Sequence, residues 1–527
     1  MGVIVAYPLP LNSSRTGLQR RLRGAATIAL ACAGFAGLAQ AQENAELSMA
    51  PAIRATLPEA PRAALPDAPV PNTQQSFAQQ TAGTAGIRFA GNVTVQQATP
   101  GALPLSLDDA ISRGVKNNLQ VLLAGQTEES VRGQVLSVFY YLLPNLKASA
   151  YTNAEEINLE ALGFKKSSLA AFGLNPATFS TIVKVDTTDA QLSADQVLFN
   201  LPDFYLYAAA KKATNVVSLN TLNVRGNVVL EVGTQYLAAL ADQAQIANAR
   251  ALLTSDEEVL RQATLSHDAG VGTNLDVLRA KVQLQTEQQA LVNAENTFAK
   301  DKIALTRLIG LPADQELTLT DTVPYAELTE LSHDEVMAVA FQHRKDLLEL
   351  QAQLAVVERA RKAVKYERLP QLAFNGYYGV LGETHGLYHG IFTAQGVLKI
   401  PIFEEARFRG ESETTAAQEI ALRQQIEALR VTIDQQIRAS KLDVESSAEL
   451  VRVARSNVDL AGQALSDTRD RFAAGVDDNL PVVQAQATLA NAQSRLISTE
   501  FQLNQAKLQL ARNTGVVETE YKQYLGR

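Results

Sequence analysis

The chain carries the same module twice, and this internal repeat limits the folds that it can adopt. Residues 105–109 (LSLDD) match residues 331–335 (LSHDE), and residues 143–146 (LPNL) match residues 369–372 (LPQL). Both matches have an offset of 226 residues, which is 331 minus 105, and neither needs a gap. A chain with two copies of one unit is expected to build one architecture from two equivalent halves.

A second set of matches lies further along each copy, at an offset of 205 residues, which is 475 minus 270. It pairs Gly270-Val271 with Gly475-Val476, Asn274-Leu275 with Asn479-Leu480, Arg307 with Arg512, and Gly310 with Gly515. Because this second offset is smaller than the first, the connection between the two sets of landmarks is longer in the first copy than in the second.

The composition favours helices over a wide aromatic core and argues against one class of partner. Aromatic residues make up 6% of the 527 residues, and tryptophan is absent. The net charge is −8 and the isoelectric point is near 5.4. Because polyanion binding needs a basic stripe, a nucleic-acid partner is not expected.

The N-terminal residues are typical of a secretory signal. An arginine-rich stretch at residues 20–23 precedes an apolar run at residues 24–38, and Ala39-Gln40-Ala41 follows. This order predicts a signal peptide over residues 1–41, with cleavage after Ala41. The alternative, a membrane anchor, would need a longer apolar run to cross a bilayer.

Cys32 is the only cysteine of the chain, and it lies inside the predicted signal. The mature chain is therefore expected to lack thiols and disulfides. Lipid attachment at Cys32 is a second interpretation, because Ala29-Leu30-Ala31 loosely resembles a lipobox. Residues 42–104 are rich in Ala, Pro, Gln and Thr without apolar periodicity, which predicts a disordered linker or an arm that docks elsewhere.

Each repeat is predicted to open with a capped helix, over residues 107–143 and 334–369. Ser106 and Ser332 can accept a hydrogen bond from a first-turn amide. Asp109 and Glu335, three residues later, can bond back to the serine amide. A proline follows within one residue of each pattern and ends it.

Two strands are then predicted in each repeat. In the second repeat, residues 372–380 place apolar side chains on one face, and residues 391–403 return after a loop. In the first repeat, residues 146–152 and 181–199 have the same roles around a longer loop. The chain is therefore expected to supply four strands.

Very long helical patterns follow the strands. Residues 204–268 would form a helix about 97 Å long at 1.5 Å per residue, and residues 404–474 a slightly longer one. The return helices, residues 275–309 and 480–514, would each span about 52 Å. One return helix and one opening helix placed end to end are about as long as one long helix. This predicts a cylinder in which continuous long helices alternate with pairs of shorter helices placed end to end. Residues 311–330 and 516–527 would then lie around the middle of the cylinder, which we call its waist.

Oligomerisation is predicted from the strand count. Four strands cannot close a barrel, and open edges in hydrocarbon would leave backbone groups unpaired. Three chains give about twelve strands, an even number within the range of outer-membrane barrels. The expected fold is mainly α, with a membrane β-barrel portion to which each chain contributes four strands.

With these landmarks the chain resembles the TolC-type outer-membrane efflux protein family over residues 105–515. The resemblance rests on both capped openings, both Leu-Pro-x-Leu corners, the proline-flanked strand exits near Pro202 and Pro401, and both Gly-Val turns. It implies a homotrimer with a twelve-stranded outer-membrane barrel and a long α-helical barrel in the periplasm. It also implies contact with outer-membrane lipid, and a periplasmic adaptor (membrane fusion) protein and an inner-membrane pump as partners.

The resemblance divides the mature chain into five parts: the linker, a first repeat (105–310), an equatorial connector (311–330), a second repeat (331–515) and a tail (516–527). It implies passive passage for the cargo of an efflux or type I secretion system. The sequence does not identify that cargo.

The two Gly-Val turns are the candidate site, because the resemblance places them at the periplasmic tip. The candidate adaptor contacts are Gly270, Val271, Gly272, Asn274, Gly475, Val476 and Asn479. A candidate acidic gate consists of Asp276, Asp477 and Asp478. Asp477 and Asp478, tripled by symmetry, would attract cations at a constriction. Equally, carboxylates at this point can serve only to cap a return helix.

Other signals are weaker. Glu383, His385 and His389 are candidate ligands of a metal ion, but Gly386 and the predicted strands on both sides favour a solvated loop. The sequence has no glycine-rich phosphate cradle and no nucleophile with its base at a recognisable spacing, so neither an enzyme nor a cofactor is expected. The competing function is an exported coiled-coil structural or adaptor protein without a pore.

Overall fold

The computed structural model describes residues 100–161, 180–322 and 332–526. The predicted signal peptide, Cys32 and nearly all of the predicted linker lie outside these residues, as do parts of the first strand loop and of the equatorial connector. Within the described ranges no helix combines the length and apolar character that a bilayer crossing requires.

The first repeat contains a short strand, a broken opening helix, two long strands and a helical hairpin. Its elements are β1 (Leu103–Leu105), α2 (Leu107–Asn117), α3 (Leu119–Phe139), η2 (Tyr140–Leu142), β2 (Asn145–Asn158), β3 (Ile182–Phe199), α5 (Leu201–Asp268) and α6 (Asn274–Ile309). The helix α5 has 68 residues, which corresponds to about 100 Å. The predicted order of elements in this repeat is confirmed.

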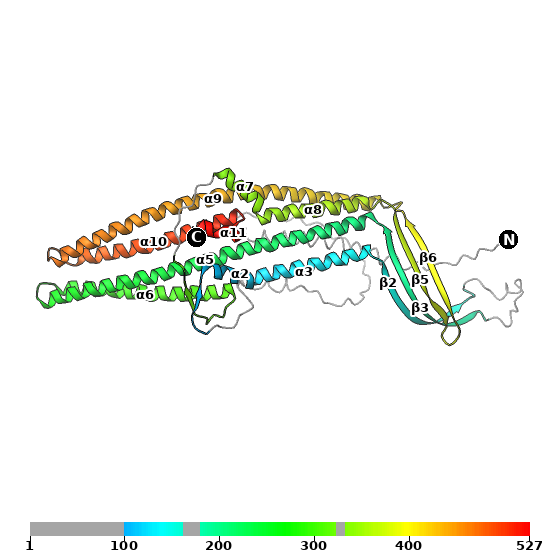
Figure 1. The fold of residues 1–527 in the computed structure, drawn as a ribbon, viewed down its shortest axis with the longest axis horizontal. Helices are drawn as coiled ribbons and strands as arrows, with labels where there is room; N and C mark the ends of the chain where they lie inside the picture. Colours follow the sequence, from blue (N-terminus) through cyan, green and yellow to red (C-terminus); the bar gives the residue numbers. More distant parts are fainter. Residues whose placement is uncertain (1–99, 162–179, 323–331, 527) are drawn as a thin grey trace, which may run out of the picture. The chain divides into compact units, whose positions relative to one another are not determined.

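The second repeat follows the same order, and the chain ends in an extra helix. Its elements are α7 (His333–His343), α8 (Lys345–Tyr366), β5 (Gln371–Glu383), β6 (Tyr388–Lys399), α9 (Glu405–Ala473) and α10 (Leu480–Asn513). The connector before this repeat contains β4 (Leu317–Leu319), and the tail after it forms α11 (Val517–Leu525). Figure 1 shows the two long hairpins, α5–α6 and α9–α10, side by side. The strands lie at the ends of α5 and α9 that are farthest from the hairpin turns.

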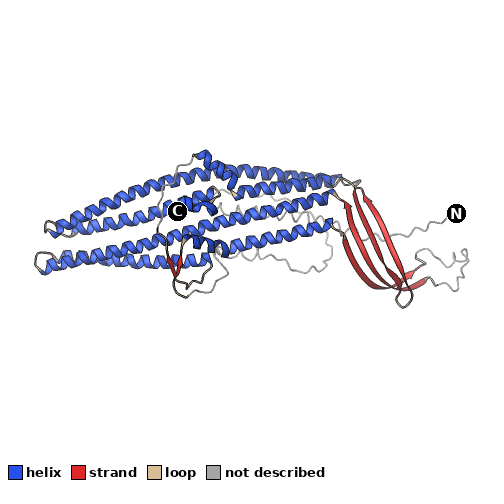
Figure 2. Cartoon of the chain, viewed as in Figure 1, coloured by secondary structure: helices blue, strands red, loops and turns tan. Residues whose placement is uncertain are grey.

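The four long strands form one antiparallel sheet in the order β2-β3-β5-β6. The hairpins β2–β3 and β5–β6 each come from one repeat, and the pairing of β3 with β5 joins the two repeats. The strands β2 and β6 are the edges of this sheet within the single chain. Figure 2 shows the sheet at one end of the helices.

Capping explains where the opening helices begin. Ser332 and Glu335 form the predicted capping box, with both reciprocal hydrogen bonds. At Ser106 only half of the prediction is confirmed: the serine oxygen accepts from the Asp109 amide at 3.2 Å. The Asp109 carboxylate, however, accepts from the Ser106 hydroxyl at 2.9 Å rather than from its amide.

Each opening helix was predicted to be continuous, and this was wrong. The break falls at Asn118 in the first repeat and at Arg344 in the second, both in extended conformation. These two residues are equivalent at the offset of 226 residues, which is 344 minus 118. The Asn118 side chain caps α3 by accepting from the Gln120 amide at 2.8 Å.

The predicted linker and tail also contain regular structure. Residues 103–105, placed in the linker and at the start of the first repeat, form β1, which pairs in parallel with β4 of the equatorial connector. The tail forms α11, whose Leu525 is fully buried. Tyr521 donates a hydrogen bond from its hydroxyl to Asp108 at 2.5 Å, so the tail is fixed to the start of α2.

The largest apolar core lies where these pieces meet at the waist, around the middle of α5. It joins α2, α5, α6, α10, α11 and the β1–β4 pair. Tyr236 of α5 is fully buried there, and its hydroxyl donates to the Leu105 carbonyl at 3.0 Å. The waist therefore holds the opening helix α2 and the return helices α6 and α10 against the middle of α5.

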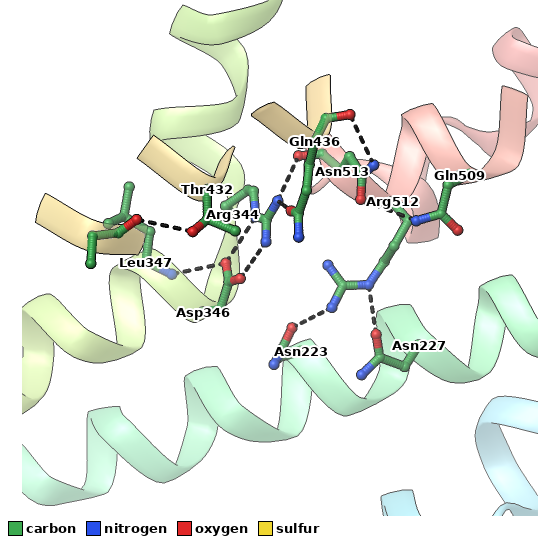
Figure 3. Close-up of polar contacts among 11 residues, drawn as sticks. Asn223, Asn227, Arg344, Asp346, Leu347, Thr432, Gln436, Gln509, Arg512 and Asn513 are labelled. Carbon is green, nitrogen blue, oxygen red and sulfur yellow. Dashed lines mark hydrogen bonds and ion pairs between the residues drawn. The ribbon is translucent and has the colours of Figure 1, made fainter. Parts of the chain in front are cut away.

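A buried polar network lies beside this core at the break between α7 and α8 (Figure 3). The Arg344 guanidinium donates to the Asp346 carboxylate at 3.0 and 2.5 Å and to the Gln436 side chain at 2.6 Å. Arg512 reaches across to α5 and donates to Asn223 and Asn227, each at 2.7 Å. Burial alone would raise the pKa of Asp346, but Arg344 outweighs it and holds the pKa below its usual value.

Candidate functional site

Both Gly-Val turns adopt the same local backbone. Gly270 and Gly475 have φ values of 77° and 71°, a left-handed conformation that is costly for residues with a Cβ atom. The amides of Val271 and Val476 bond back to the carbonyls of Ser266 and Arg471, each at 3.0 Å. The repeat therefore produces the same reversal twice.

The two valines are the most exposed apolar side chains at these turns. Val271 is 84% exposed and Val476 is 68% exposed. Gly272 lies too close to the preceding helix for a side chain, because a Cβ atom there would come within 2.9 Å of the Ser266 Cβ atom. Asn274, which begins α6, is also exposed. Five of the seven predicted contact residues thus lie on the tip surface, and Gly272 is half-buried beside them.

Asn479, the seventh, lies elsewhere. It is fully buried, and its side-chain amide donates to the Asp276 carbonyl at 2.6 Å. This hydrogen bond joins the second turn to the start of α6 in the first hairpin. Asn479 therefore connects the two hairpins inside the tip rather than presenting a polar group to solvent.

The three predicted gate carboxylates all have partners within the chain. Asp276 is buried in a capping box with Thr273. Asp478 is exposed and accepts from the Leu480 amide at 3.1 Å and from Arg279 at 3.5 Å. Asp477 forms an ion pair with Arg471 at 2.7 Å. In the single chain, Asp276 and Asp478 cap helices and Asp477 is paired.

A small apolar core directly behind the turns holds the four helices of the tip together. We call it the tip core, and it consists of Val259, Ala263, Ala280, Leu465, Val482 and Ala485. Its members come from α5, α6, α9 and α10. Because both hairpins share this core, a movement of one hairpin relative to the other would have to rearrange it.

Next to the tip core is a layer of buried and half-buried polar side chains that was not predicted. We call it the polar layer, and it consists of Ser255, Asp256, Gln283, Glu287, Arg469 and Gln486. The Ser255 hydroxyl accepts from the Gln486 amide at 3.1 Å and also from Arg469. Gln283 donates to the Glu287 carboxylate at 3.3 Å. All four tip helices contribute to this layer.

Asp256 is the most unusual member of the polar layer. Its side chain is 2% exposed, and neither carboxyl oxygen has a hydrogen-bond partner among the described residues. Burial and the neighbouring Glu287 raise its pKa to about 6, although Gln283, Arg469 and Gln486 oppose the shift. Burial likewise raises the pKa of Glu287.

The repeat itself contains a signal that would have identified this acidic pair. The offset of 205 residues places Ala461 opposite Asp256 and Ala492 opposite Glu287 in the alignment of the two hairpins. Both alanines are buried. The hairpin fold therefore accepts small apolar residues at these positions, and packing alone does not require the two carboxyl groups.

Of Glu383, His385 and His389, only His385 lies in the loop between β5 and β6. Within the described ranges, no three His, Cys, Asp or Glu side chains come together as metal ligands. His389 is paired in the sheet with Leu381, and Glu383 ends β5.

A comparison with known proteins identifies the family of this chain. A family model described as "Outer membrane efflux protein" matches residues 110–311 and 336–516. The chain belongs to the outer membrane efflux protein family. The two matched segments correspond to the two structural repeats.

Curated relatives of this family member are distant in sequence. The toluene efflux pump outer membrane protein TtgF of Pseudomonas putida is 24% identical over 309 residues, which cover 55% of this chain and 60% of TtgF. The outer membrane protein TolC of Vibrio cholerae is 22% identical over 424 residues, which cover 79% of this chain and 92% of TolC. The chain thus spans less than two thirds of TtgF but most of TolC.

Solved structures show the same fold. The CmeC outer membrane channel of Campylobacter jejuni covers 78% of this chain with a TM-score of 0.65 and 14% identity; 86% of CmeC is matched. The outer membrane protein VceC of Vibrio cholerae covers 78% with a TM-score of 0.64 and 15% identity; 96% of VceC is matched. The family member described here therefore has the expected combination of long helical hairpins and a strand portion.

Proposed function

We propose that three copies of this chain form a passive channel across the outer membrane, with their helices extending into the periplasm. The observation that carries this proposal is the open four-stranded sheet at one end of the two long hairpins, in a member of the outer membrane efflux protein family. Three such sheets supply enough strands for a closed barrel. Closure leaves no unpaired edge in the hydrocarbon.

The partners in this proposal are a periplasmic adaptor and an inner-membrane pump, which supplies the energy. The exposed valines of the two turns support an adaptor contact, because they are apolar groups at the surface directly after a left-handed glycine. TtgF and TolC are named as outer membrane proteins, TtgF of a toluene efflux pump. The cargo of this chain is not assigned.

The test of the channel is its structure and conductance after extraction in detergent. A three-fold particle that conducts ions in planar bilayers is the expected result. A soluble monomer or dimer without a membrane portion would overturn the proposal and support an exported coiled-coil adaptor. Heating should also shift the protein on gels, as barrel proteins do.

The adaptor contact can be tested with Val271→Asp/Val476→Asp, which places charges on both turns. We expect this variant to lose adaptor recovered after cross-linking, while the trimer and its conductance are retained. The matched control is Leu387→Asp. Leu387 is 81% exposed and lies in the β5–β6 loop, away from the two turns. Equal adaptor recovery in the parent and both variants would contradict a contact at the turns.

The acidic gate formed by Asp276, Asp477 and Asp478 remains a proposal of its own. If Asp477 and Asp478 line a constriction, Asp477→Asn/Asp478→Asn should reduce cation selectivity in planar bilayers. Unchanged selectivity would leave these residues with the capping and pairing roles seen in the single chain.

A further inference from the structure

The two faces of the four-stranded sheet differ in chemistry. Up to Val197, the register places the even-numbered residues of β2, β3, β5 and β6 on one face and the odd-numbered residues on the other. The even face carries exposed apolar side chains, which include Leu146, Leu192, Tyr378, Val380 and Phe392. The odd face carries mainly polar side chains, which include Asn145, Ser149, Asn153, Gln191, Ser193, Asn375, Thr393 and Gln395. Because the apolar face of an outer-membrane barrel meets lipid and the polar face lines its interior, we call them the lipid face and the pore face.

Three carboxylates gather on the pore face, in the half of the sheet farthest from the helices. They are Glu155 of β2, Asp189 of β3 and Glu383 of β5, and we call them the acidic triplet. Thr187 lies directly opposite both Asn153 and Glu383, so each member of the triplet lies in this row or two residues from it. The register therefore brings three negative charges from three strands into a short span of the sheet.

No lysine or arginine of the described strands balances the triplet on its own face. The cations of the pore face are Lys147 and Lys399, which lie toward the ends of β2 and β6 that adjoin the helices. Lys147 is six residues from Asn153 (153 minus 147), which is about 20 Å at 3.4 Å per residue. Lys184 pairs with Glu156 at 3.6 Å, but both lie on the lipid face. The outer part of the pore face is therefore negative.

Asp189 is the buried member of the triplet. It is 6% exposed, and one of its carboxylate oxygens accepts from the Tyr151 hydroxyl at 3.0 Å. The other oxygen is buried and has no hydrogen-bond partner among the described residues. A carboxylate that is only half satisfied favours a positive charge nearby. Glu155 and Glu383 are exposed, so they can meet ions in the pore directly.

The repeat shows that the fold does not need these charges. The strand β2 corresponds to β5 at the offset of 226 residues. The strand β3 corresponds to β6 at an offset of 204 (399 minus 195), because Asn145 pairs with Asp195 and Gln371 pairs with Lys399. Each member of the triplet has a neutral equivalent in the other repeat: Leu381 for Glu155, Ile157 for Glu383 and Thr393 for Asp189.

We propose that the acidic triplet makes the outer part of the pore selective for cations, so that positively charged cargo leaves more readily than negatively charged cargo. The inference rests on the proposed trimeric channel, in which three copies of the triplet surround one pore. Rings of Asp and Glu side chains select cations in other channels. The triplet is separate from the candidate acidic gate, which lies at the hairpin turns.

The test is the reversal potential of the purified trimer in planar bilayers under a KCl gradient, which gives the permeability ratio of K⁺ to Cl⁻. We expect the parent to prefer K⁺, and Glu155→Gln/Glu383→Gln to lower the ratio at least about twofold at about 0.1 M salt. The effect should shrink at about 1 M salt, because the Debye length falls from about 10 Å to about 3 Å. Glu155→Lys/Glu383→Lys should turn the preference toward Cl⁻.

The matched control removes the same number of exposed carboxylates from the lipid face. It is Glu156→Gln/Asp186→Asn, in which Glu156 is the sequence neighbour of Glu155, and it should keep the permeability ratio of the parent. A second comparison separates the triplet from the gate. The decrease caused by Glu155→Gln/Glu383→Gln should persist when Asp477→Asn/Asp478→Asn is the starting protein.

The outcomes separate this inference from the proposed function. A conducting trimer without a preference for K⁺, or with the same ratio in the parent and Glu155→Gln/Glu383→Gln, would overturn the role of the triplet and leave the channel. An equal decrease in the lipid-face control would also overturn it, because the face would then make no difference. A parent protein that is not trimeric or does not conduct would overturn the proposed channel itself.

Discussion

The carboxyl group of Asp256 should make the tip less stable as the pH rises. In the packed tip this group is buried with no hydrogen-bond partner among the described residues, and its pKa is raised from 3.8 to about 6. An opened tip would return the group to water and to its ordinary pKa. The packed state therefore has its full stability below the ordinary value and loses it as the pH rises through about 6.

The size of the effect follows from the two pKa values. A difference of about two units corresponds to a maximum of about 3 kcal/mol, since each unit is worth about 1.36 kcal/mol. Between about pH 4.5 and about pH 7.5 the loss would be about 2 kcal/mol, or roughly 30-fold in the opening equilibrium. The raised pKa of Glu287 adds to this effect in the same direction.

The assay is amide hydrogen exchange of the detergent-extracted protein, followed by mass spectrometry of peptides from the tip helices. The parent and Asp256→Asn are compared at each pH, which removes the intrinsic pH dependence of exchange. Asp256→Asn should remove most of the difference between low and neutral pH around the polar layer. Asp256→Ala/Glu287→Ala, which copies the second repeat, should do the same.

A matched control is available on the same helix. Burial and the neighbouring Asp301 raise the pKa of Asp242 to about 6 as well, further from the turns. Asp242→Asn should alter exchange near its own position and leave the tip peptides unchanged. If the tip peptides of the parent and Asp256→Asn show the same pH dependence, the reasoning from burial is refuted.

Three further perturbations test other contacts. Gly515→Ala should lower the thermal transition of the protein far more than Gly475→Ala, because a Cβ atom at Gly515 would come within 2.7 Å of backbone at the α7–α8 break, whereas Gly475 faces open space. We expect overpacking at Gly515 to cost about 1–3 kcal/mol more, and equal transitions would contradict this. Arg344→Ala should destabilise the waist by about 1–3 kcal/mol in denaturant unfolding, because it removes a buried guanidinium that bonds to Asp346 and Gln436 and leaves the half-buried Asp346 carboxylate without its ion-pair partner. Asn479→Ala should increase hydrogen exchange at both turns by an amount equivalent to about 1 kcal/mol, and an effect confined to one turn would argue against a link between the hairpins.

Much of the architecture could be predicted because it depends on local rules. Proline, glycine and capping residues mark the ends of the long elements, and the repeat shows each signal twice. The long helix predicted over residues 204–268 is observed as Leu201–Asp268, and the one predicted over residues 404–474 as Glu405–Ala473.

The contacts at the waist could not be predicted in this way, because they depend on side chains far apart in the sequence. Arg344 is an ordinary helix-forming residue, and nothing beside it in the sequence signals a break. The break accompanies a close approach of Gly515 to the backbone of His343 and Arg344. Similarly, the three residues of β1 become a strand only because β4 lies beside them.

At the tip, the exposed valines and the glycine turns were predictable from the sequence, but the roles of the buried polar groups were not. The resemblance placed Asn479 among the candidate adaptor contacts, whereas the fold buries it inside the tip. Similarly, Asp256 and Glu287 fit the pattern of solvated helix faces when only one helix is considered. Their burial becomes clear only when α5, α6, α9 and α10 are packed together.

The differences between the two repeats are informative because both copies fold under the same constraints. A feature that both copies share, such as the left-handed glycine or the break at Asn118 and Arg344, follows from the architecture that they have in common. The acidic pair of the polar layer is present in one copy, while the other copy has buried alanines at both positions. Since a buried carboxyl group without a partner costs free energy, its presence in the polar layer weakens the packing of the two hairpins against each other at neutral pH. The structure thus gives this contact a pH-dependent weakness whose two acidic groups both come from the α5–α6 hairpin.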